Sequence, residues 1–160
     1  MRGAGAILLG GSAAAAMIAA TRTSAPLMLQ NVTPSLPKGF YVREVGAIRK
    51  GAIVAFRQPE RARAYLTSLG YPANALLLKR VVASEGDVVC ALADRVRLAE
   101  RTAFRAQSDR KGVALPLWNG CRRLNAGELF AFGDTPTSFD SRYFGPVSAS
   151  LIVGRYRRWL

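Results

Sequence analysis

From residue 39 onward, the apolar residues of this chain occur in short runs that glycine or aspartate interrupts, and this pattern constrains the fold more than any other feature. Short apolar runs bounded by turn residues are typical of β-strands. The runs that we expect to form strands cover residues 40–42, 52–56, 76–78, 81–82, 88–89, 95–98, 129–132 and 151–153. Gly46, Gly51 and the pair Gly86-Asp87 separate several of them. The sequence therefore predicts a mainly β protein, either a small irregular barrel or a set of folded antiparallel sheets.

One segment departs from this pattern and predicts a helix over residues 59–69. Pro59 opens it, Glu60 places a negative charge in its first turn, and Gly70 follows its last residue. These are common signals at the start and the end of a helix. Its apolar side chains fall mainly on one side: Ala62, Tyr65, Leu66 and Leu69. We expect this helix to be a single insertion between strands.

The first part of the chain has a different character. Residues 3–20 contain no charged side chain, and Arg2 and Arg22 flank them. This length is at the lower limit for a helix that spans a bilayer. The segment is either an uncleaved transmembrane anchor or a signal peptide that is removed, with a buried helix of a soluble domain as the remaining alternative. We therefore divide the chain into a membrane anchor or signal segment, residues 1–24, and an exported domain, residues 25–160.

The chain is strongly basic, with a formal net charge of +13, and 19 of its 23 basic residues are arginine. Such an excess favours an anionic partner, either a nucleic acid or a membrane surface. The arginines are scattered, and the sequence has neither a long basic run nor an aromatic and basic RNA-binding motif. We therefore expect the basic residues to form a solvated surface beside acidic lipid headgroups, with no nucleic acid as a partner.

The absence of histidine limits the chemistry of any active site. It excludes Ser-His-Asp and Cys-His mechanisms and histidine-ligated zinc, so that a catalytic base must be Lys, Asp, Glu or Tyr. The two cysteines, Cys90 and Cys121, are too few to form a structural zinc site. We expect no metal and no cofactor. In an exported domain the two cysteines are expected to form a disulfide, with two buried thiols as the alternative.

Lys79 is the candidate base, because it lies within the apolar run of residues 75–82. If this run is a strand, Leu77 and Val81 share a face with Lys79, whereas Arg80 points outward. Burial among apolar side chains lowers the pKa of a lysine, and a neutral lysine can take a proton from a hydroxyl. Leu77 and Leu78 are expected to line a pocket for small substrate side chains. The alternative is a lysine at a sheet edge, with its ammonium group in water.

Two further segments carry polar groups that could act with this lysine. In Thr33-Pro34-Ser35-Leu36-Pro37-Lys38-Gly39, two prolines and a glycine hold Ser35 in a rigid loop, although an ordinary turn serine is the alternative. Residues 133–146 form a polar box between glycines, which contains hydroxyls, two carboxylates and an arginine. This box could position a neighbouring base, or it could be a polar surface loop.

Along the chain, the serine loop comes first, the lysine strand second and the polar box third. In that order the three segments resemble the signal peptidase I family over roughly residues 31–147. Leu78-Lys79-Arg80-Val81-Val82, with Glu85-Gly86-Asp87 behind it, is similar to the Lys-Arg-Val…Gly-Asp motif of that family. The resemblance implies the signal peptidase fold, with Ser35 as nucleophile and Lys79 as general base. It implies that the oxyanion is bound by the backbone N–H of Ser35 and the hydroxyl of Thr33. Supporting roles fall to residues of the box: Ser138, which would hydrogen-bond and aim Lys79, Asp140 and Arg142 as a structural pair, and Asp134.

The nucleophile segment departs from the usual Ser-Met-x-Pro of signal peptidases. Its Ser-x-Pro-x-Gly-x-Tyr form, residues 35–41, resembles the TraF-type peptidases of conjugative plasmids. Those enzymes process the transfer pilin precursor, and some join its ends into a ring. The resemblance therefore implies a membrane-bound serine endopeptidase that acts on a pilin or another exported precursor. It would lie in the inner membrane with its catalytic domain on the periplasmic side, or in the periplasm if the first segment is removed.

Three other functions are compatible with parts of the sequence. A general signal peptidase would remove secretory signal peptides with the same chemistry. A self-cleaving repressor also uses serine and lysine, but it would need a DNA-binding helical domain where this chain has an apolar segment. A non-enzymatic, exported basic module of a secretion system would leave Ser35 and Lys79 far apart, and Lys79 would titrate normally.

Overall fold

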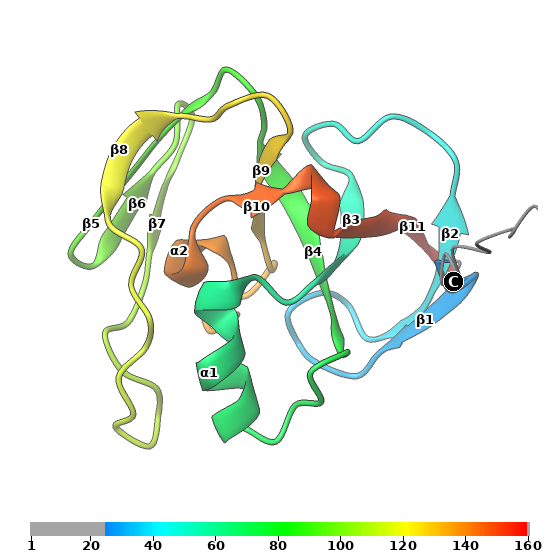
Figure 1. Ribbon diagram of the computed structural model, residues 1–160, viewed down its shortest axis with the longest axis horizontal. Helices are drawn as coiled ribbons and strands as arrows, with labels where there is room; N and C mark the ends of the chain where they lie inside the picture. Colours follow the sequence, from blue (N-terminus) through cyan, green and yellow to red (C-terminus); the bar gives the residue numbers. More distant parts are fainter. Residues whose placement is uncertain (1–24, 160) are drawn as a thin grey trace, which may run out of the picture.

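The computed structural model describes residues 25–159 of the chain, which form two antiparallel β-sheets with short helices beside them (Figure 1). The expectation of a mainly β fold with folded antiparallel sheets is therefore confirmed. The expected N-terminal anchor or signal segment, residues 1–24, lies outside the described residues. Among residues 25–159, none of the helices is long and apolar enough to cross a membrane.

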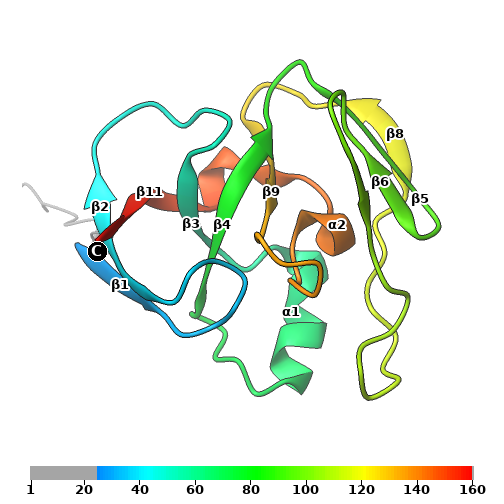
Figure 2. The same ribbon diagram turned by 180° about the vertical axis from the view of Figure 1, so that it is seen from behind.

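The larger sheet has seven strands and contains most of the candidate site. In spatial order its strands are β1 (Met28–Asn31), β2 (Gly39–Glu44), β11 (Ile152–Trp159), β3 (Ile53–Arg57), β4 (Leu76–Ala83), β9 (Glu128–Phe132) and β10 (Val147–Ser148). The sheet is strongly curved, as the two opposite views show (Figures 1 and 2). Although β2, β11 and β3 separate β1 from β4 within the sheet, residues of β1 and β4 line one cleft.

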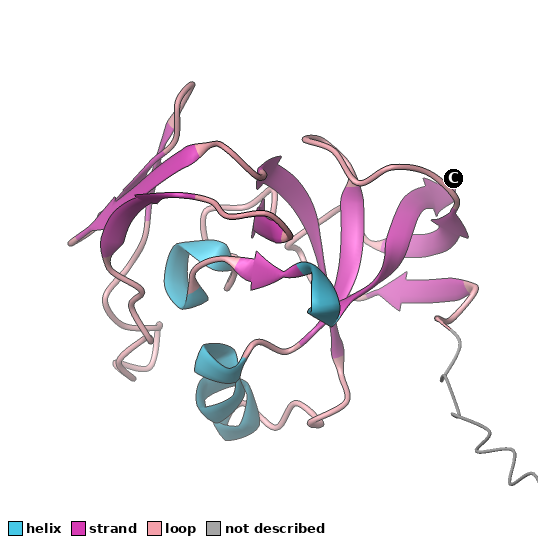
Figure 3. Cartoon of the chain, turned by 45° about the horizontal axis from the view of Figure 1, so that its top comes forward, coloured by secondary structure: helices cyan, strands magenta, loops and turns pink. Residues whose placement is uncertain are grey.

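The smaller sheet has four strands and is inserted between β4 and β9. Its order is β7 (Thr102–Phe104), β6 (Arg95–Arg97), β5 (Val88–Leu92) and β8 (Gly120–Arg123). It stands at one end of the molecule, away from β1 and β2 (Figure 3). Cys90 of β5 lies directly opposite Cys121 of β8, and the two form the disulfide that the sequence predicts.

The expected helix is α1 (Glu60–Ser68), inserted between β3 and β4. It ends where predicted, because Gly70 adopts a φ of +80° and its N–H donates to the carbonyl of Thr67 at 2.9 Å. Positive φ costs glycine little, so this residue can stop a helix. The structure adds two short helical turns that the sequence analysis did not predict, α2 (Ser141–Phe144) and the 3₁₀ turn η1 (Ala149–Leu151).

The strand expected at residues 151–153 is much longer in the structure. Leu151 belongs to η1, and β11 begins at Ile152 and continues to Trp159. The prediction stopped early because it followed continuous apolar runs. In the second half of β11, buried Tyr156 stands between arginines, which is the pattern of a strand with one apolar face.

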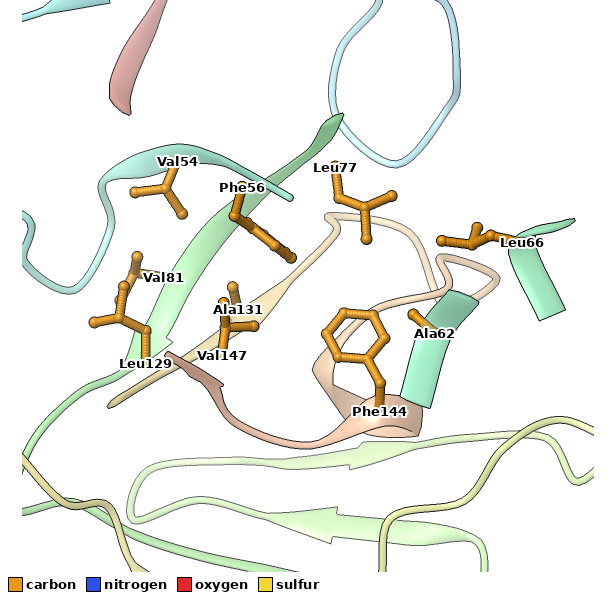
Figure 4. Close-up of a cluster of buried hydrophobic side chains, with 10 residues drawn as sticks. All are labelled: Val54, Phe56, Ala62, Leu66, Leu77, Val81, Leu129, Ala131, Phe144 and Val147. Atoms are coloured by element: carbon orange, nitrogen blue, oxygen red, sulfur yellow. The ribbon is translucent and has the colours of Figure 1, made fainter. Parts of the chain in front are cut away.

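Buried apolar side chains pack on both faces of β4. On one face, an apolar cluster joins β3, β4 and β9 to α1 and α2 (Figure 4). It consists of Val54, Phe56, Ala62, Leu66, Leu77, Val81, Leu129, Ala131, Phe144 and Val147. A second cluster contains Leu78 and consists of Leu36, Tyr41, Ala55, Leu78 and Tyr156. Lys79 thus lies in a strand that contributes to a buried apolar cluster on each of its two faces.

Candidate active site

A cleft of about 520 Å³ lies between β1, the loop that follows it, the first half of β4, α1 and the loop at residues 135–139. Most of the site residues expected from the sequence line it: Thr33, Ser35, Leu77, Leu78, Lys79 and Ser138. The remaining wall is largely apolar and includes Leu29, Leu66 and Phe139. The structure therefore brings together, in one cleft, residues from three segments far apart in the sequence.

Lys79 is almost completely buried, with 5% of its surface exposed. Because burial removes water from the ammonium group, it lowers the pKa of Lys79 from 10.5 to about 8. The carboxylate of Asp140 acts in the opposite direction, and Arg142 adds to the lowering. Arg80, the next residue in the strand, faces outward and pairs with Asp134 at 3.0 Å. The alternation of β4 thus separates a buried lysine from an exposed arginine, as the strand pattern predicts.

Ser35 lies in the loop between β1 and β2, and its side chain is also buried. The neighbouring Leu36 anchors the loop, because its side chain is 1% exposed and packs in the cluster with Leu78. The hydroxyl of Tyr41 donates to the carbonyl of Pro37 at 2.7 Å and holds the far side of the loop. Within the loop, the hydroxyl oxygens of Thr33 and Ser35 are 3.0 Å apart.

The polar box is organised by a buried ion pair between Asp140 and Arg142. The side chain of Asp140 is fully buried and accepts from the Arg142 guanidinium at 2.7 and 2.8 Å. It also accepts from the backbone N–H of Gly133 at 2.8 Å. Arg142 in turn donates to the carbonyls of Thr135 and Ser138. The pair therefore fixes the loop that forms one wall of the cleft, without lining the cleft itself.

Asp134 connects the box to the serine loop through its backbone rather than its side chain. Its carboxylate faces Arg80 on the outer side of β4. Its N–H donates to the carbonyl of Ser35 at 2.5 Å. The preceding Gly133 makes this approach possible, because a Cβ there would collide with the side chain of Ser138 and lie 2.8 Å from the Ser35 carbonyl oxygen.

Ser138 lines the same cleft as Lys79, and its hydroxyl is buried. Among the described residues, this hydroxyl and that of Thr135 are the two buried side-chain groups without a hydrogen-bond partner. The bond from Ser138 to Lys79 that the family resemblance implies is thus not formed in this structure. A buried hydroxyl without a partner is energetically unfavourable. A hydrogen bond between Ser138 and a group that enters the cleft would remove this cost.

Asn31 is a site residue that the sequence analysis missed. It is the last residue of β1, its side chain is 8% exposed, and its amide is hydrogen-bonded to three residues of the serine loop. The signal that could have revealed it is the Asn31-x-Thr33 spacing, since asparagine side chains often bond the backbone two residues ahead. Within residues 25–159, no three acidic or cysteine side chains are grouped to hold a metal ion.

The curved antiparallel sheets, the buried lysine and the serine that shares its cleft are the features of a serine peptidase of the kind expected from the sequence. Comparison with known proteins agrees at the level of the family. The chain belongs to the signal peptidase family, peptidase S26, which matches residues 4–160.

Proteins with curated descriptions give a more specific similarity. The chain is 31% identical to a plasmid transfer protein TraF of Escherichia coli, over 92% of this chain and 89% of that protein. It is 32% identical to a conjugal transfer protein TraF of Agrobacterium fabrum, over 79% of this chain and 78% of that protein. Among solved structures, a signal peptidase I of Enterococcus faecalis is 18% identical with a TM-score of 0.42, covering 70% of this chain and 98% of that one.

Proposed function

We propose that this chain is a serine endopeptidase in which Ser35 is the nucleophile and Lys79 is the general base. The observation that carries the proposal is the burial of Lys79 in the same cleft that Ser35 lines. With a pKa of about 8, Lys79 is partly neutral near neutral pH, whereas an exposed lysine is almost entirely protonated. A neutral lysine beside a serine hydroxyl can activate it without histidine.

The proposed reaction proceeds through an acyl-enzyme. Ser35 Oγ bonds to the carbonyl carbon of the scissile peptide while its proton passes to Lys79. The tetrahedral intermediate then releases the amine, as the C–N bond breaks and Lys79 returns the proton to the leaving nitrogen. A water molecule completes hydrolysis by attacking the ester. If the amine of a peptide chain attacks instead, a new peptide bond forms, and a chain whose own N-terminus attacks becomes a ring.

The negative charge of the intermediate needs hydrogen-bond donors that are already in position. We assign this role to the backbone N–H of Ser35 and the hydroxyl of Thr33, which lies 3.0 Å from Ser35 Oγ. Ser138 is proposed to orient Lys79 once substrate closes the cleft, because its buried hydroxyl has no other partner in the described chain. Leu77 and Leu78 are proposed to contact small side chains of the substrate.

The proposed substrate is the precursor of a conjugative transfer pilin. Two observations support it: the relatives described as plasmid and conjugal transfer proteins, and the Ser-x-Pro-x-Gly-x-Tyr form at residues 35–41. The reaction would take place on the exported side of the inner membrane, with residues 1–24 as the anchor or as a signal that is removed. Fractionation of cells should place the full chain with the membrane, and a chain without residues 1–22 should be released. Equal solubility of both would contradict an anchor.

The test is processing of a co-expressed pilin precursor by wild type and by single variants. Ser35→Ala, Lys79→Ala and Lys79→Arg should all be inactive while they remain folded, because guanidinium stays protonated and cannot accept the serine proton. Lys38→Arg and Lys50→Arg are the controls and should retain activity, since Lys38 is exposed and Lys50 pairs with Asp87 on the surface. Cleavage by a folded Lys79→Arg protein would refute the mechanism.

The same experiment separates the alternatives. Cleavage of unrelated secretory precursors, but not of the pilin precursor, would indicate a general signal peptidase. Mass spectrometry of the product distinguishes ring formation from hydrolysis, because a ring is lighter by one water molecule. The alternative of a non-enzymatic basic module expects Ser35 and Lys79 to lie apart, whereas both line one cleft.

A further inference from the structure

Asn31 closes the loop that carries Ser35. It pairs with Gly39 across β1 and β2, so residues 32–38 form a loop whose two ends meet at this residue pair. The Asn31 side chain, 8% exposed, is bonded to the inside of that loop rather than to the sheet. A buried amide at this position must have its donors and acceptor satisfied locally, because an unpaired buried polar group is costly.

Both ends of the Asn31 amide are used. Nδ2 donates to the carbonyls of Thr33 at 3.0 Å and Leu36 at 2.9 Å, with a longer contact to Pro37 at 3.3 Å. Oδ1 accepts from the Thr33 backbone N–H at 3.3 Å and from the Thr33 hydroxyl at 3.0 Å. The reversed amide would set its oxygen against these carbonyl oxygens, so the orientation is determined by the partners. The amide thus hydrogen-bonds the loop on both sides of Ser35, at Thr33 and at Leu36.

The direction of the hydrogen bonds follows from counting protons. The Thr33 hydroxyl has one proton, and Asn31 Oδ1 can only accept, so the proton lies between these two groups. Thr33 Oγ1 must then accept at its contact with Ser35, 3.0 Å away, and the Ser35 hydroxyl donates. The hydrogen bonds therefore run in series from Ser35 to Thr33 to Asn31, and Asn31 sets the orientation of the Ser35 hydroxyl in the resting site.

We propose that Asn31 is a positioning residue for the reaction at Ser35, which sets the shape of the serine loop and the orientation of the Thr33 and Ser35 hydroxyls. This proposal rests on the proposed function of Ser35. The backbone N–H of Ser35 lies on the same loop and must be aimed at the oxyanion before charge develops there. The Thr33 hydroxyl donates to Asn31 in the resting site, so it must turn during the reaction to donate to the oxyanion. Small errors in such an arrangement lower the rate strongly while leaving substrate binding largely intact.

The test is a kinetic comparison with purified pilin precursor. Asn31→Ala should lower kcat between about 10- and 100-fold with little change in KM. The control, Asn125→Ala, replaces an exposed asparagine outside the cleft and should leave kcat unchanged. In a Thr33→Val background the effect of Asn31→Ala should shrink, because part of it passes through the Thr33 hydroxyl. If Asn31→Ala lowers kcat by the same factor in both backgrounds, in proportion to a loss of stability, then Asn31 has only a structural role.

A second measurement does not depend on a substrate. In the Ser35→Ala protein, Asn31→Ala should speed hydrogen exchange of the five non-proline amides at residues 32–38 by about ten-fold or more, while the remaining strands stay protected. Unchanged exchange in this loop would overturn the proposal. The two proposals fail in different ways: activity in Ser35→Ala would refute the proposed nucleophile, whereas an inactive Ser35→Ala with a fully active Asn31→Ala would refute the role of Asn31 alone.

Discussion

The backbone N–H of Asp134 donates a hydrogen bond of 2.5 Å to the carbonyl of Ser35. This bond joins the loop of the proposed nucleophile to the polar box, although the two segments lie at opposite ends of the domain sequence. The approach depends on Gly133, where any side chain would enter space held by Ser138 and the Ser35 carbonyl. The connection depends on a short distance between two backbones, which explains why a glycine precedes the aspartate.

Gly133→Ala should therefore damage the site more than its small size suggests. The added methyl group must push the serine loop away from the box, and such overpacking costs about 1–3 kcal/mol. We expect a lower melting temperature and a strong loss of cleavage. Gly154→Ala is the matched control, because its Cβ would make contacts of 3.3 Å or longer and its φ is not in the left-handed region. Full activity in Gly133→Ala would contradict the close approach.

The rate of cleavage should rise with pH through about 8. The proposed base is neutral Lys79, burial lowers its pKa to about 8, and the fraction of neutral lysine grows as the pH passes this value. A pH profile of kcat/KM should level off above the midpoint. Lys50→Ala should leave the profile in place, since Lys50 is exposed and bonded to Asp87. A midpoint near 10.5 would show that Lys79 is not held in this environment.

Lys79→Met should abolish cleavage and stabilise the fold. The unfolded chain keeps the lysine proton up to a pH near 10.5, whereas the folded chain releases it at about 8. This difference means that burying the charged form costs about 3 kcal/mol at pH 7. Replacing Lys79 by an uncharged side chain of similar length should recover much of that free energy. The gain should shrink as the pH rises from 8 to 10.5, and denaturant unfolding at three pH values would measure it.

Asp140→Ala should destabilise the whole box. It would leave the Arg142 guanidinium, 4% exposed, without its counter-ion, and breaking a buried ion pair in this way costs about 3–5 kcal/mol. Asp134→Ala is the comparison, because it removes an exposed partner of Arg80, for which a loss below about 1 kcal/mol is expected. Urea unfolding of the two variants should separate them clearly. Similar midpoints would mean that the buried pair contributes no more than the surface pair.

Loss of the disulfide should affect stability and leave the chemistry intact. Cys90 and Cys121 join two strands of the smaller sheet and do not line the cleft. Opening a loop of this length costs about 3–4 kcal/mol in the chain-entropy model. The Cys90→Ala, Cys121→Ala double variant should therefore melt at a lower temperature and still cleave when folded. An inactive but folded double variant would link the smaller sheet to the reaction.

The sequence predicted the parts of this molecule that depend on local pattern. The apolar run around Lys79 predicted a strand with a buried lysine, and Pro59, Glu60 and Gly70 predicted the bounds of α1 within one residue at each end. Strands β1, β7, β8 and β10 were not predicted, because they are short and half exposed and owe their conformation to pairing with neighbours.

Some features of the candidate site could likewise be predicted from local sequence, and others depend on tertiary packing. Motif order predicted Ser35 and Lys79 as candidate catalytic residues, but their presence in one cleft depends on the curvature of the sheet, which no local pattern encodes. Asn31 was missed because its role lies in bonds to backbone carbonyls, which any residue of the loop can offer. The free hydroxyl of Ser138 is likewise a property of packing, since it depends on which groups surround it.

The place of β11 has a consequence for when the enzyme can work. β11 pairs with β2 on one side and β3 on the other, so it completes the sheet between the serine loop and the lysine strand. Before residues 152–159 are in place, the two halves of the cleft have no connection through the larger sheet. A chain in which β11 is not yet paired would thus carry both proposed catalytic residues on segments that the sheet does not join, and we expect such a chain not to cleave.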